Sequence, residues 1–438
     1  MSEKSTVRWL RHLTMFVLLA IAGSAIGHQA VGTVSARPAD ATGNELVVGA
    51  LLSITGPWST LGQTSRAVLT IAAKDINDQL ARQGSPMRIR VMVEDTQTDP
   101  TVALAKLKSL AARNIRFVIG PQASAEVSAI KHYVQEKGII VISQSSTAHA
   151  LANAGDNIFR FCPDDVRETE AMAALVREEG VSVLVPIWRD DAGNAGLRDS
   201  MRTNFPIGGG KVLEGVRYGA DTKDFAPVVR SLSAKVKGAV DTHTATRVGV
   251  YLAAFDEAVH ILTLAAADPL LASVQWYGSD GLVQSKTLVS DPSAASFAAR
   301  VGLPNPIFGL DESAARVWKP LVEAVTAKIG TPPDAFALAT YDALWVVART
   351  VEKMGPGADM ESLKAALAGI AEVHSGATGN TRLNAAGDRA VGNFDFWAIC
   401  RDKGSFAWQR VAVYQAESGG PGTVKRLAGC GTRASSGR

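Results

Sequence analysis

Three loops of the sequence carry side chains that together can bind a small molecule with one negative and one positive group. Ser124 follows one expected strand, Ser145 and Thr147 belong to the hydroxyl-rich loop after another, and Asp280 lies in a turn after a third. Hydroxyls and helix N-terminal N–H groups bind a carboxylate, whereas a fixed aspartate binds an ammonium. A free amino acid presents both groups on one carbon, so the combination predicts an amino-acid site.

Each of these residues also has an ordinary structural interpretation. Ser124 and Thr147 would serve as N-caps of the helices that follow them, and Asp280 beside Gly281 would serve as a turn residue. Taken singly, the residues do not decide between the two interpretations. Their combination favours the binding site.

Sequence signatures of catalysis are scarce. The run Gly208–Lys211 is followed by Val212, where a phosphate-binding loop needs Ser or Thr. No G-x-S-x-G elbow occurs, and the seven histidines show no metal-ligand spacing. His149 stands near the hydroxyl-rich loop as a possible base, although a lone loop histidine is more often a surface residue. We therefore expect no catalytic residues, no metal and no cofactor.

The elements that position these loops alternate between strands and helices. Short apolar or alternating runs predict strands at 46–52, 88–94, 115–120, 138–143, 181–187, 212–218, 247–252 and 274–278. Apolar residues recur at helical spacing in 66–80, 125–136 and 320–354. This alternation is typical of βαβ units in parallel sheets. Because there are too many units for one sheet, we expect an α/β protein with two doubly wound lobes, divided near 163–165.

Composition and the N-terminus restrict the class of protein. The 438 residues carry a formal net charge of +3 and no long basic run, so nucleic acid is not an expected partner. Basic residues precede an apolar run at 13–27, which is short for a membrane span. We therefore expect a cleaved signal peptide at 1–36, with cleavage after Ala25 as the rival and a membrane anchor as the alternative.

Export places the three cysteines in an oxidising compartment. Cys400 and Cys430 both lie in the C-terminal part, and we expect a disulfide between them. Cys162 lies in an apolar strand-like run, where a lone cysteine is expected to be a buried free thiol.

The chain from Glu45 to about Gln415 resembles the leucine/isoleucine/valine-binding type of periplasmic substrate-binding proteins of ABC transporters. The similarity rests on short motifs in the same order along the chain: GALLSITGP at 49–57, EDTQTDP at 94–100, FVIG at 117–120, the loop 141–147, Asp224-Phe225, YGSDG at 277–281, ATYDA at 339–343 and GDR at 387–389. The resemblance implies two Rossmann-like lobes joined by a three-strand hinge, with the ligand cleft between them.

The resemblance also implies roles for single residues. Ser124 stands where the family binds the ligand carboxylate, and Thr147 where it contacts both charged groups. Ser145 matches the residue whose backbone carbonyl accepts the ammonium, and Asp280 matches an acidic residue that pairs the ammonium from the second lobe. Phe255 replaces a tyrosine of the leucine-binding type.

The rest of the expected pocket is less typical of the branched-chain pattern. Leu61 replaces an aromatic of the first loop, with Trp58 nearby, and the segment 190–194 lacks the usual aromatic-Gly pair. With Gln122 and Ala123, these residues predict a moderately apolar pocket with one amide.

We expect lobe 1 to contain 45–162 and 283–378, lobe 2 to contain 163–282 and 379–416, and 417–438 to be a flexible tail. The predicted function is capture of an apolar amino acid, or a close analogue, by lobe closure and delivery to an ABC permease by a monomer. The alternatives are a sensor of the same fold and, from another class, an exported hydrolase.

Overall fold

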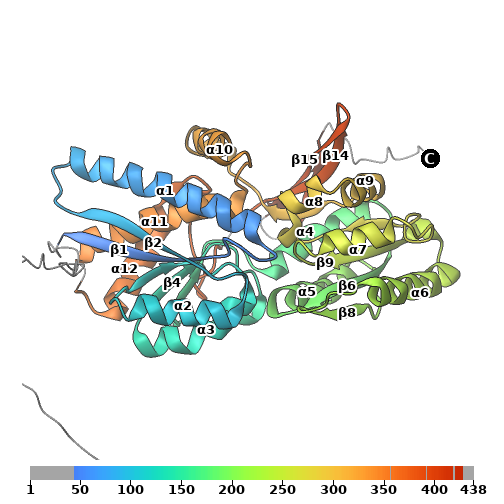
Figure 1. Cartoon of the computed structure of the whole chain (residues 1–438), viewed down its shortest axis with the longest axis horizontal. Coiled ribbons are helices and arrows are strands. Elements are labelled where there is room, and N and C mark those ends of the chain that lie inside the picture. The colour runs from blue at the N-terminus through green and yellow to red at the C-terminus, as the bar shows by residue number, and fades with distance from the viewer. Residues whose placement is uncertain (1–43, 356, 391, 418–419, 428–438) are drawn as a thin grey trace, which may run out of the picture. The chain divides into compact units, whose positions relative to one another are not determined.

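The computed structural model describes residues 44–427 except 356, 391 and 418–419. The described part belongs to one compact unit, Gly43–Arg438, shown in Figure 1. The predicted signal peptide at 1–36 and Cys430 lie outside the described residues.

The first lobe is built on a parallel five-stranded sheet in the order β2-β1-β3-β4-β5. Its strands are β1 (Glu45–Leu52), β2 (Arg88–Asp95), β3 (Phe117–Ile119), β4 (Ile140–Ser143) and β5 (Ile158–Arg160). Four helices cover its two faces and α12 packs beside α11: α1 (Ser59–Arg82), α2 (Pro100–Ala111), α3 (Ser124–Lys137), α11 (Ala335–Met354) and α12 (Met360–Val373). In Figure 1, α1 and α11 lie on one side of the strands, and α2 and α3 on the other.

The apolar run of β1 is continuous because both faces of this sheet are buried. Val48, Ala50 and Leu52 pack into the core cluster shared with α1 and α11. Leu51 points to the opposite cluster, which α2 and α3 complete. This packing fixes where β1 ends. Because the neighbouring strands are parallel to it, the loops after them gather at the same edge of the sheet.

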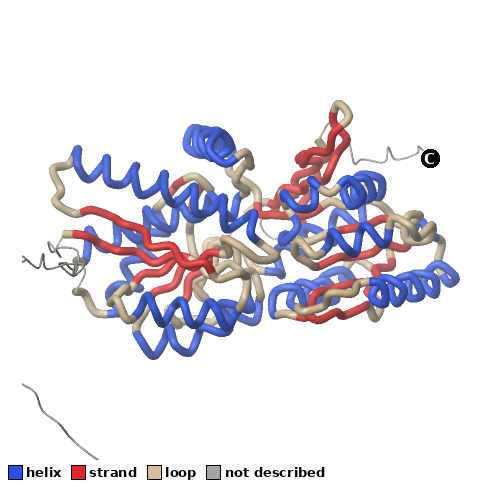
Figure 2. Tube along the Cα trace, viewed as in Figure 1, coloured by secondary structure: helices blue, strands red, loops and turns tan. Residues whose placement is uncertain are grey.

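The second lobe is built on a second parallel sheet, in the order β10-β9-β6-β7 with β8 also paired to β6. Its strands are β6 (Val183–Asp190), β7 (Lys211–Val212), β8 (Val216–Gly219), β9 (Val248–Ala253) and β10 (Gln275–Tyr277). Its helices are α4 (Asp165–Glu178), α5 (Ala192–Ile207), α6 (Ala226–Thr242), α7 (Ala258–Ala265), α8 (Lys286–Ser290) and α9 (Pro292–Val301). Figure 2 shows the two sets of strands, each flanked by helices. The predicted α/β fold with two parallel-sheet lobes is confirmed.

Two predicted elements are divided in the structure. The strand expected at 212–218 is two short strands, β7 and β8. The helix expected at 320–354 is α10 (Ala315–Ile329) followed by α11. Gly330 ends α10 in the left-handed conformation, with φ +71°, and the Pro332-Pro333 pair that follows prevents the helix from continuing.

A third sheet is antiparallel; strands were expected within 379–416, but not a separate sheet. It has the order β11-β14-β15-β16 and consists of β11 (Asn305–Phe308), β14 (Phe394–Asp402), β15 (Ser405–Glu417) and β16 (Gly420–Arg426). A further two-residue pair joins β12 (Ser375–Gly376) and β13 (Gly379–Asn380). The segment after Glu417, expected to be a loose tail, instead supplies β16, because the edge of β15 offers it a partner from Ala412 to Glu417.

The packing of α8 and α9 differs from the expected division of the chain at Leu282. Leu288, Phe297 and Val301 belong to the core cluster of the second sheet, so the chain stays with the second lobe beyond that point. Cys162 is a buried free thiol as predicted. Cys400 is disulfide-bonded, and its pairing with Cys430 remains a prediction because Cys430 is not among the described residues.

Candidate ligand-binding site

The loop after β3 brings Ser124 to the first turn of α3. Gly120 begins this loop with φ +84°, and a Cβ there would lie 2.0 Å from the carbonyl oxygen of Leu51, so only glycine fits. Ala123, predicted to line the pocket, donates its N–H to Glu126 Oε2 at 2.9 Å. Burial above all raises the pKa of Glu126 to about 7.

Gln122 was predicted to offer its amide to a ligand, but the structure engages the amide within the protein. Its Oε1 accepts the Ser53 N–H at 2.8 Å, and its Nε2 donates to the Trp58 carbonyl at 3.3 Å. The side chain therefore joins the loop after β1 to the loop after β3. We assign it to positioning these loops.

The loop after β4 places its hydroxyls beside Ser124. Ser124 Oγ accepts hydrogen bonds from the Ala148 N–H at 3.2 Å and from Ser146 Oγ at 3.1 Å. Since both bonds use its lone pairs, the Ser124 hydroxyl keeps its own hydrogen for a ligand. Ser145 Oγ donates to the Gln122 carbonyl at 3.1 Å, and Thr147 is buried next to them.

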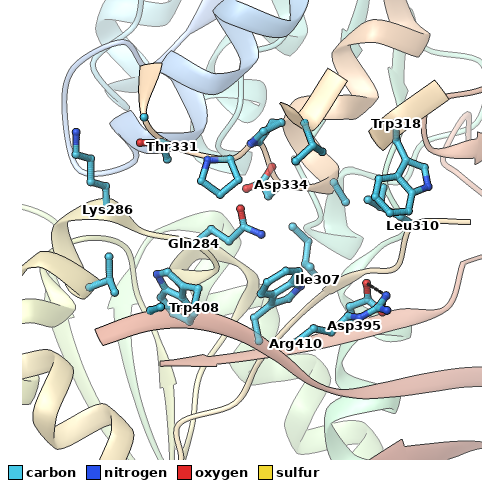
Figure 3. A pocket seen from close by; sticks show the side chains of 18 of the residues that line it. Gln284, Lys286, Ile307, Leu310, Trp318, Thr331, Asp334, Asp395, Trp408 and Arg410 are labelled. Atoms are coloured by element: carbon cyan, nitrogen blue, oxygen red, sulfur yellow. Dashed lines mark hydrogen bonds and ion pairs between the residues drawn. The ribbon is translucent and has the colours of Figure 1, made fainter. Parts of the chain in front are cut away.

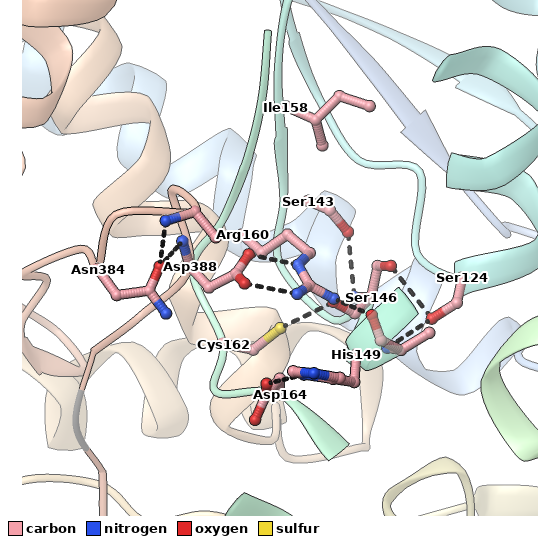
Figure 4. Close-up of polar contacts among 12 residues, drawn as sticks. Ser124, Ser143, Ser146, His149, Ile158, Arg160, Cys162, Asp164, Asn384 and Asp388 are labelled. Atoms are coloured by element: carbon pink, nitrogen blue, oxygen red, sulfur yellow. Dashed lines mark hydrogen bonds and ion pairs between the residues drawn. The ribbon is translucent and has the colours of Figure 1, made fainter. Parts of the chain in front are cut away.

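A buried ion pair supports this loop from behind (Figure 4). Arg160, at the end of β5, donates to the carbonyls of Ser146 at 3.1 Å and Ala148 at 2.7 Å. Its Nη2 also donates to Asp388 Oδ2 at 2.6 Å, and its Nε to Asp388 Oδ1 at 2.5 Å. Every polar edge of the guanidinium thus fixes either the loop or the C-terminal part of the chain, and the sequence alone did not reveal this.

The second lobe contributes Asp280, which follows β10 and is 5% exposed. Its N–H donates to Glu168 Oε1 at 3.3 Å. Burial first raises the pKa of Asp280 to about 7, against hydrogen bonds of its carboxyl group with the Gly281 backbone, the Glu168 side chain and the Thr147 side chain, which lower it. The first turn of α4 links Asp280 to the loop of Thr147, because the Asp165 N–H donates to the Thr147 carbonyl at 2.8 Å while Glu168 accepts the Asp280 N–H.

Sequence analysis missed two further carboxyl groups here. Asp165 and Glu168 lie on the first turn of α4 and are 0% and 1% exposed. Burial raises the pKa of both well above the usual range. Acidic residues in a first helical turn are common because they complement the helix dipole, so their sequence pattern alone did not distinguish them.

An aromatic contact also joins the two lobes. Trp58 of the first lobe stacks on Phe255 of the second, with ring centroids 4.7 Å apart, and meets Phe336 edge-on at 6.2 Å. The Asp256 N–H donates to the Pro57 carbonyl at 3.0 Å beside this stack. Leu61 is buried in the core cluster that includes these aromatics.

His149, which sequence analysis considered as a possible base, lies at the surface. His149 Nδ1 lies 2.7 Å from Asp164 Oδ2, and the His149 side chain is 63% exposed. Among the residues that the structure describes, no group of three or more His, Cys, Asp or Glu is arranged to hold a metal ion. Within the same residues, no helix combines the length and the hydropathy needed to cross a membrane.

A separate cavity of about 630 Å³ lies between α10, the loop before α11 and strands β14 and β15 (Figure 3). Three tryptophans line it, Trp318, Trp397 and Trp408, together with Gln284 and Asp334. It contains none of the residues predicted to bind the ligand.

Comparison with known proteins places this geometry in a family. A model of the periplasmic binding protein family matches residues 45–404. The leucine-, isoleucine-, valine-, threonine-, and alanine-binding protein of Pseudomonas aeruginosa is 25% identical, covering 90% of this chain and 96% of its own.

Solved structures share the fold at lower identity. The branched-chain amino acid transporter substrate binding protein LivJ from Streptococcus pneumoniae, in complex with isoleucine, has a TM-score of 0.67 and 19% identity, covering 84% of this chain and 99% of its own. An ABC transporter solute binding protein from R. palustris, in complex with benzoate, has a TM-score of 0.66 and 18% identity, covering 89% of this chain and 100% of its own. With a family match over most of its length and this two-lobed fold, the chain belongs to the periplasmic binding protein family.

Proposed function

We propose that this protein captures a free amino acid between its lobes outside the cytoplasm and delivers it to an ABC permease. The observation that carries the proposal is the contact between the loop of Ser124 and Thr147 and the second lobe: the Asp165 N–H donates to the Thr147 carbonyl at 2.8 Å, and Glu168, on the same helix as Asp165, accepts the Asp280 N–H at 3.3 Å. Ser124 and the first turn of α3 bind the ligand carboxylate. Asp280 and the Ser145 carbonyl bind its ammonium.

Closure of the lobes follows from where these groups lie. Ser124, Ser145 and Thr147 belong to the first lobe and Asp280 to the second, so only a closed arrangement contacts both charges of the ligand. A ligand with higher affinity for the closed arrangement shifts the population toward it. The permease then recognises the closed monomer, and the protein binds its ligand without turnover.

The expected division of the chain enters this proposal with one change. The segments 45–162 and 163–282 form the first parts of lobes 1 and 2. Since α8 and α9 pack with the second sheet, the return to lobe 1 comes after Val301. The crossovers between the lobes form the hinge.

Thermal unfolding of the purified mature protein against a panel of amino acids, amides and small carboxylates tests the proposal. A ligand that binds only the native state at 100 times its Kd adds about 2.7 kcal/mol of stability. Stabilisation by an amino acid, but not by its amide or its deaminated acid, would support recognition of both charges. A response only to acids that lack the ammonium, such as benzoate, would refute the assignment of Asp280.

Transport and sensing then need separate measurements. Uptake of the identified amino acid by cells that lack the gene should fall, and the gene for this chain should restore it. Uptake that is unchanged, together with a lost behavioural or transcriptional response to the ligand, would instead indicate a sensor.

A further inference from the structure

The cavity of about 630 Å³ beside α10 has no part in the proposed function. Its volume lies within the range of small-molecule sites, about 300–1,000 Å³, and close-packed protein interiors leave few voids larger than a water molecule. One wall is α10, which packs on α1 of the first lobe, and another is β15, which packs on α8 and α9 of the second. We call it the tryptophan cavity, after Trp318, Trp397 and Trp408 in its lining.

Two of these tryptophans are fixed in place by their own N–H groups. Trp318 Nε1 donates to the Asp311 carbonyl at 3.1 Å, and Trp408 Nε1 donates to the Ser285 carbonyl at 3.0 Å. Because their only polar group is in use, these rings offer a ligand apolar surface. Aromatic rings pack on such surface by offset stacking or edge-on contact. Since Trp318 comes from α10 and Trp408 from β15, two walls of the cavity favour a flat aromatic ligand.

Gln284 supplies a polar group to the same cavity. Its Oε1 is buried and has no hydrogen-bond partner among the residues that the structure describes, and the whole residue is 8% exposed. Figure 3 shows its side chain in the middle of the lining, pointing toward Asp334. A buried amide oxygen without a donor is costly. A ligand that brings one N–H or O–H group to Gln284 Oε1 would remove this cost.

The charged side chains of the lining are already engaged or exposed. Asp395 Oδ2 lies 3.3 Å from Arg410 Nη1, and Asp334 Oδ1 accepts the Ala337 N–H at 2.8 Å, which caps α11. Lys286 is exposed to solvent. An ion that enters an apolar site without a counter-charge loses its hydration without compensation. The cavity therefore suits a neutral molecule better than a charged one.

We infer that the tryptophan cavity is a second ligand site, for a neutral, flat aromatic compound with an N–H or O–H donor, such as an indole or a phenol. Trp318 and Trp408 contact its ring, and Gln284 Oε1 accepts its donor. The inference does not depend on the proposed function, because none of the residues proposed to bind the amino acid lines this cavity.

Ligand-observed NMR titrations of the full mature protein test the inference with two matched pairs of probes. Indole is compared with benzothiophene, and 2-naphthol with naphthalene. The members of each pair have nearly the same shape, but only the first has a donor. We expect indole or 2-naphthol to bind at least about 5-fold more tightly than its partner, the equivalent of one net hydrogen bond.

Variants of the lining assign the binding to this cavity. Gln284→Met keeps a long side chain and removes the amide, so the two members of a pair should then bind within about 2-fold of each other. Trp318→Ala and Trp408→Ala should each weaken indole at least about 10-fold, as truncation of a central aromatic contact does. The control is Trp345→Ala, a half-buried tryptophan of α11 outside the lining, which should leave every affinity unchanged.

Thermal unfolding of each variant shows whether it folds, and either tryptophan variant suffices if the other does not. Equal binding of the two members of each pair by the natural protein would overturn the inference. So would a preference for the donor that persists in Gln284→Met, or indole binding that survives both tryptophan variants, because the compound would then bind elsewhere. Binding of none of the probes would mean that the cavity holds only water and would overturn it as well. The amino-acid panel tests the proposed function separately, so each can fail without the other.

Discussion

The two lobes differ in how many polar groups of the candidate site are already hydrogen-bonded within the protein. In the first lobe, the loop carbonyls of Ser146 and Ala148 and the lone pairs of Ser124 are already used by Arg160 and by neighbouring groups. In the second lobe, the two carboxyl oxygens of Asp165 have no hydrogen-bond partner among the described residues. The first half is thus held in place by hydrogen bonds within the protein, whereas the second half keeps a buried carboxyl group whose oxygens are unused.

This contrast predicts opposite effects of mutation in the two halves. Changes to Arg160 or Asp388, which support the loop of the first half, should destabilise the protein itself. Changes in the second half should alter affinity and pH dependence while leaving the fold intact.

The largest effect should come from the support of the first half. Arg160→Met leaves the buried Asp388 without its cation, and breaking a buried ion pair in this way costs about 3–5 kcal/mol. Urea unfolding of the unliganded variant measures the loss. The double variant Arg160→Met/Asp388→Leu should recover part of it, and a single-variant loss under about 1 kcal/mol would contradict the role we assign to Arg160.

The next effect concerns Asp280. Asp280→Ala should weaken ligand binding by about 3 kcal/mol, the lower end for an unpaired buried charge, because Glu168 and Asp165 remain nearby. Calorimetry with the identified ligand measures it. Asp241→Ala, at an exposed position of α6, is the control, and a loss below about 1 kcal/mol would remove Asp280 from the site.

Ser124 should matter somewhat less. Ser124→Ala removes one hydrogen bond to a charged carboxylate, worth about 1.5–3 kcal/mol of affinity. Ser128, exposed on the same helix, gives the control Ser128→Ala. Equal affinities of the two variants would show that the carboxylate binds elsewhere.

The stability of the unliganded protein should depend on pH through Asp280 in the second half. Burial raises the pKa of Asp280 to about 7, so the native state holds a proton that the unfolded state has lost above about pH 4. The contribution of Asp280 to stability is therefore fully present below about pH 4 and is lost as the pH rises to about 7. The Tm of Asp280→Asn should fall less between pH 5 and pH 8 than that of the natural protein, and parallel curves would contradict this.

The smallest effect should come from the aromatic contact between the lobes. Phe255→Leu keeps an apolar side chain and removes the stack on Trp58, which is worth about 0.5–1.5 kcal/mol. Affinity should fall by that amount because closure becomes less favourable. An unchanged affinity would mean that the stack does not contribute to closure.

Sequence patterns predicted the features that depend on neighbouring residues along the chain, namely the strands and the loops that follow them. Continuous apolar runs identified most strands, and the carboxyl-end rule directed attention to Ser124, Thr147 and Asp280. The structure places these three residues, all buried, in the loops after β3, β4 and β10. Their roles in ligand binding remain predictions.

The parts that were missed depend on contacts far apart in the chain. Arg160 and Asp388 are separated by 228 positions, so no local pattern joins them. The role of Gln122 was misread because its amide suits a ligand and the Ser53 and Trp58 backbone equally well. Gly420–Arg426 has the composition of a loop, yet a free strand edge made it β16.

The stack of Trp58 on Phe255 also makes this protein its own optical reporter. An indole that leaves an aromatic neighbour and enters water changes its emission, and this pair separates whenever the lobes part. The chain has eight tryptophans, so the difference between the spectra of the natural protein and Trp58→Phe isolates the signal of this one. Rapid mixing would then follow opening and closing in real time, without any attached dye.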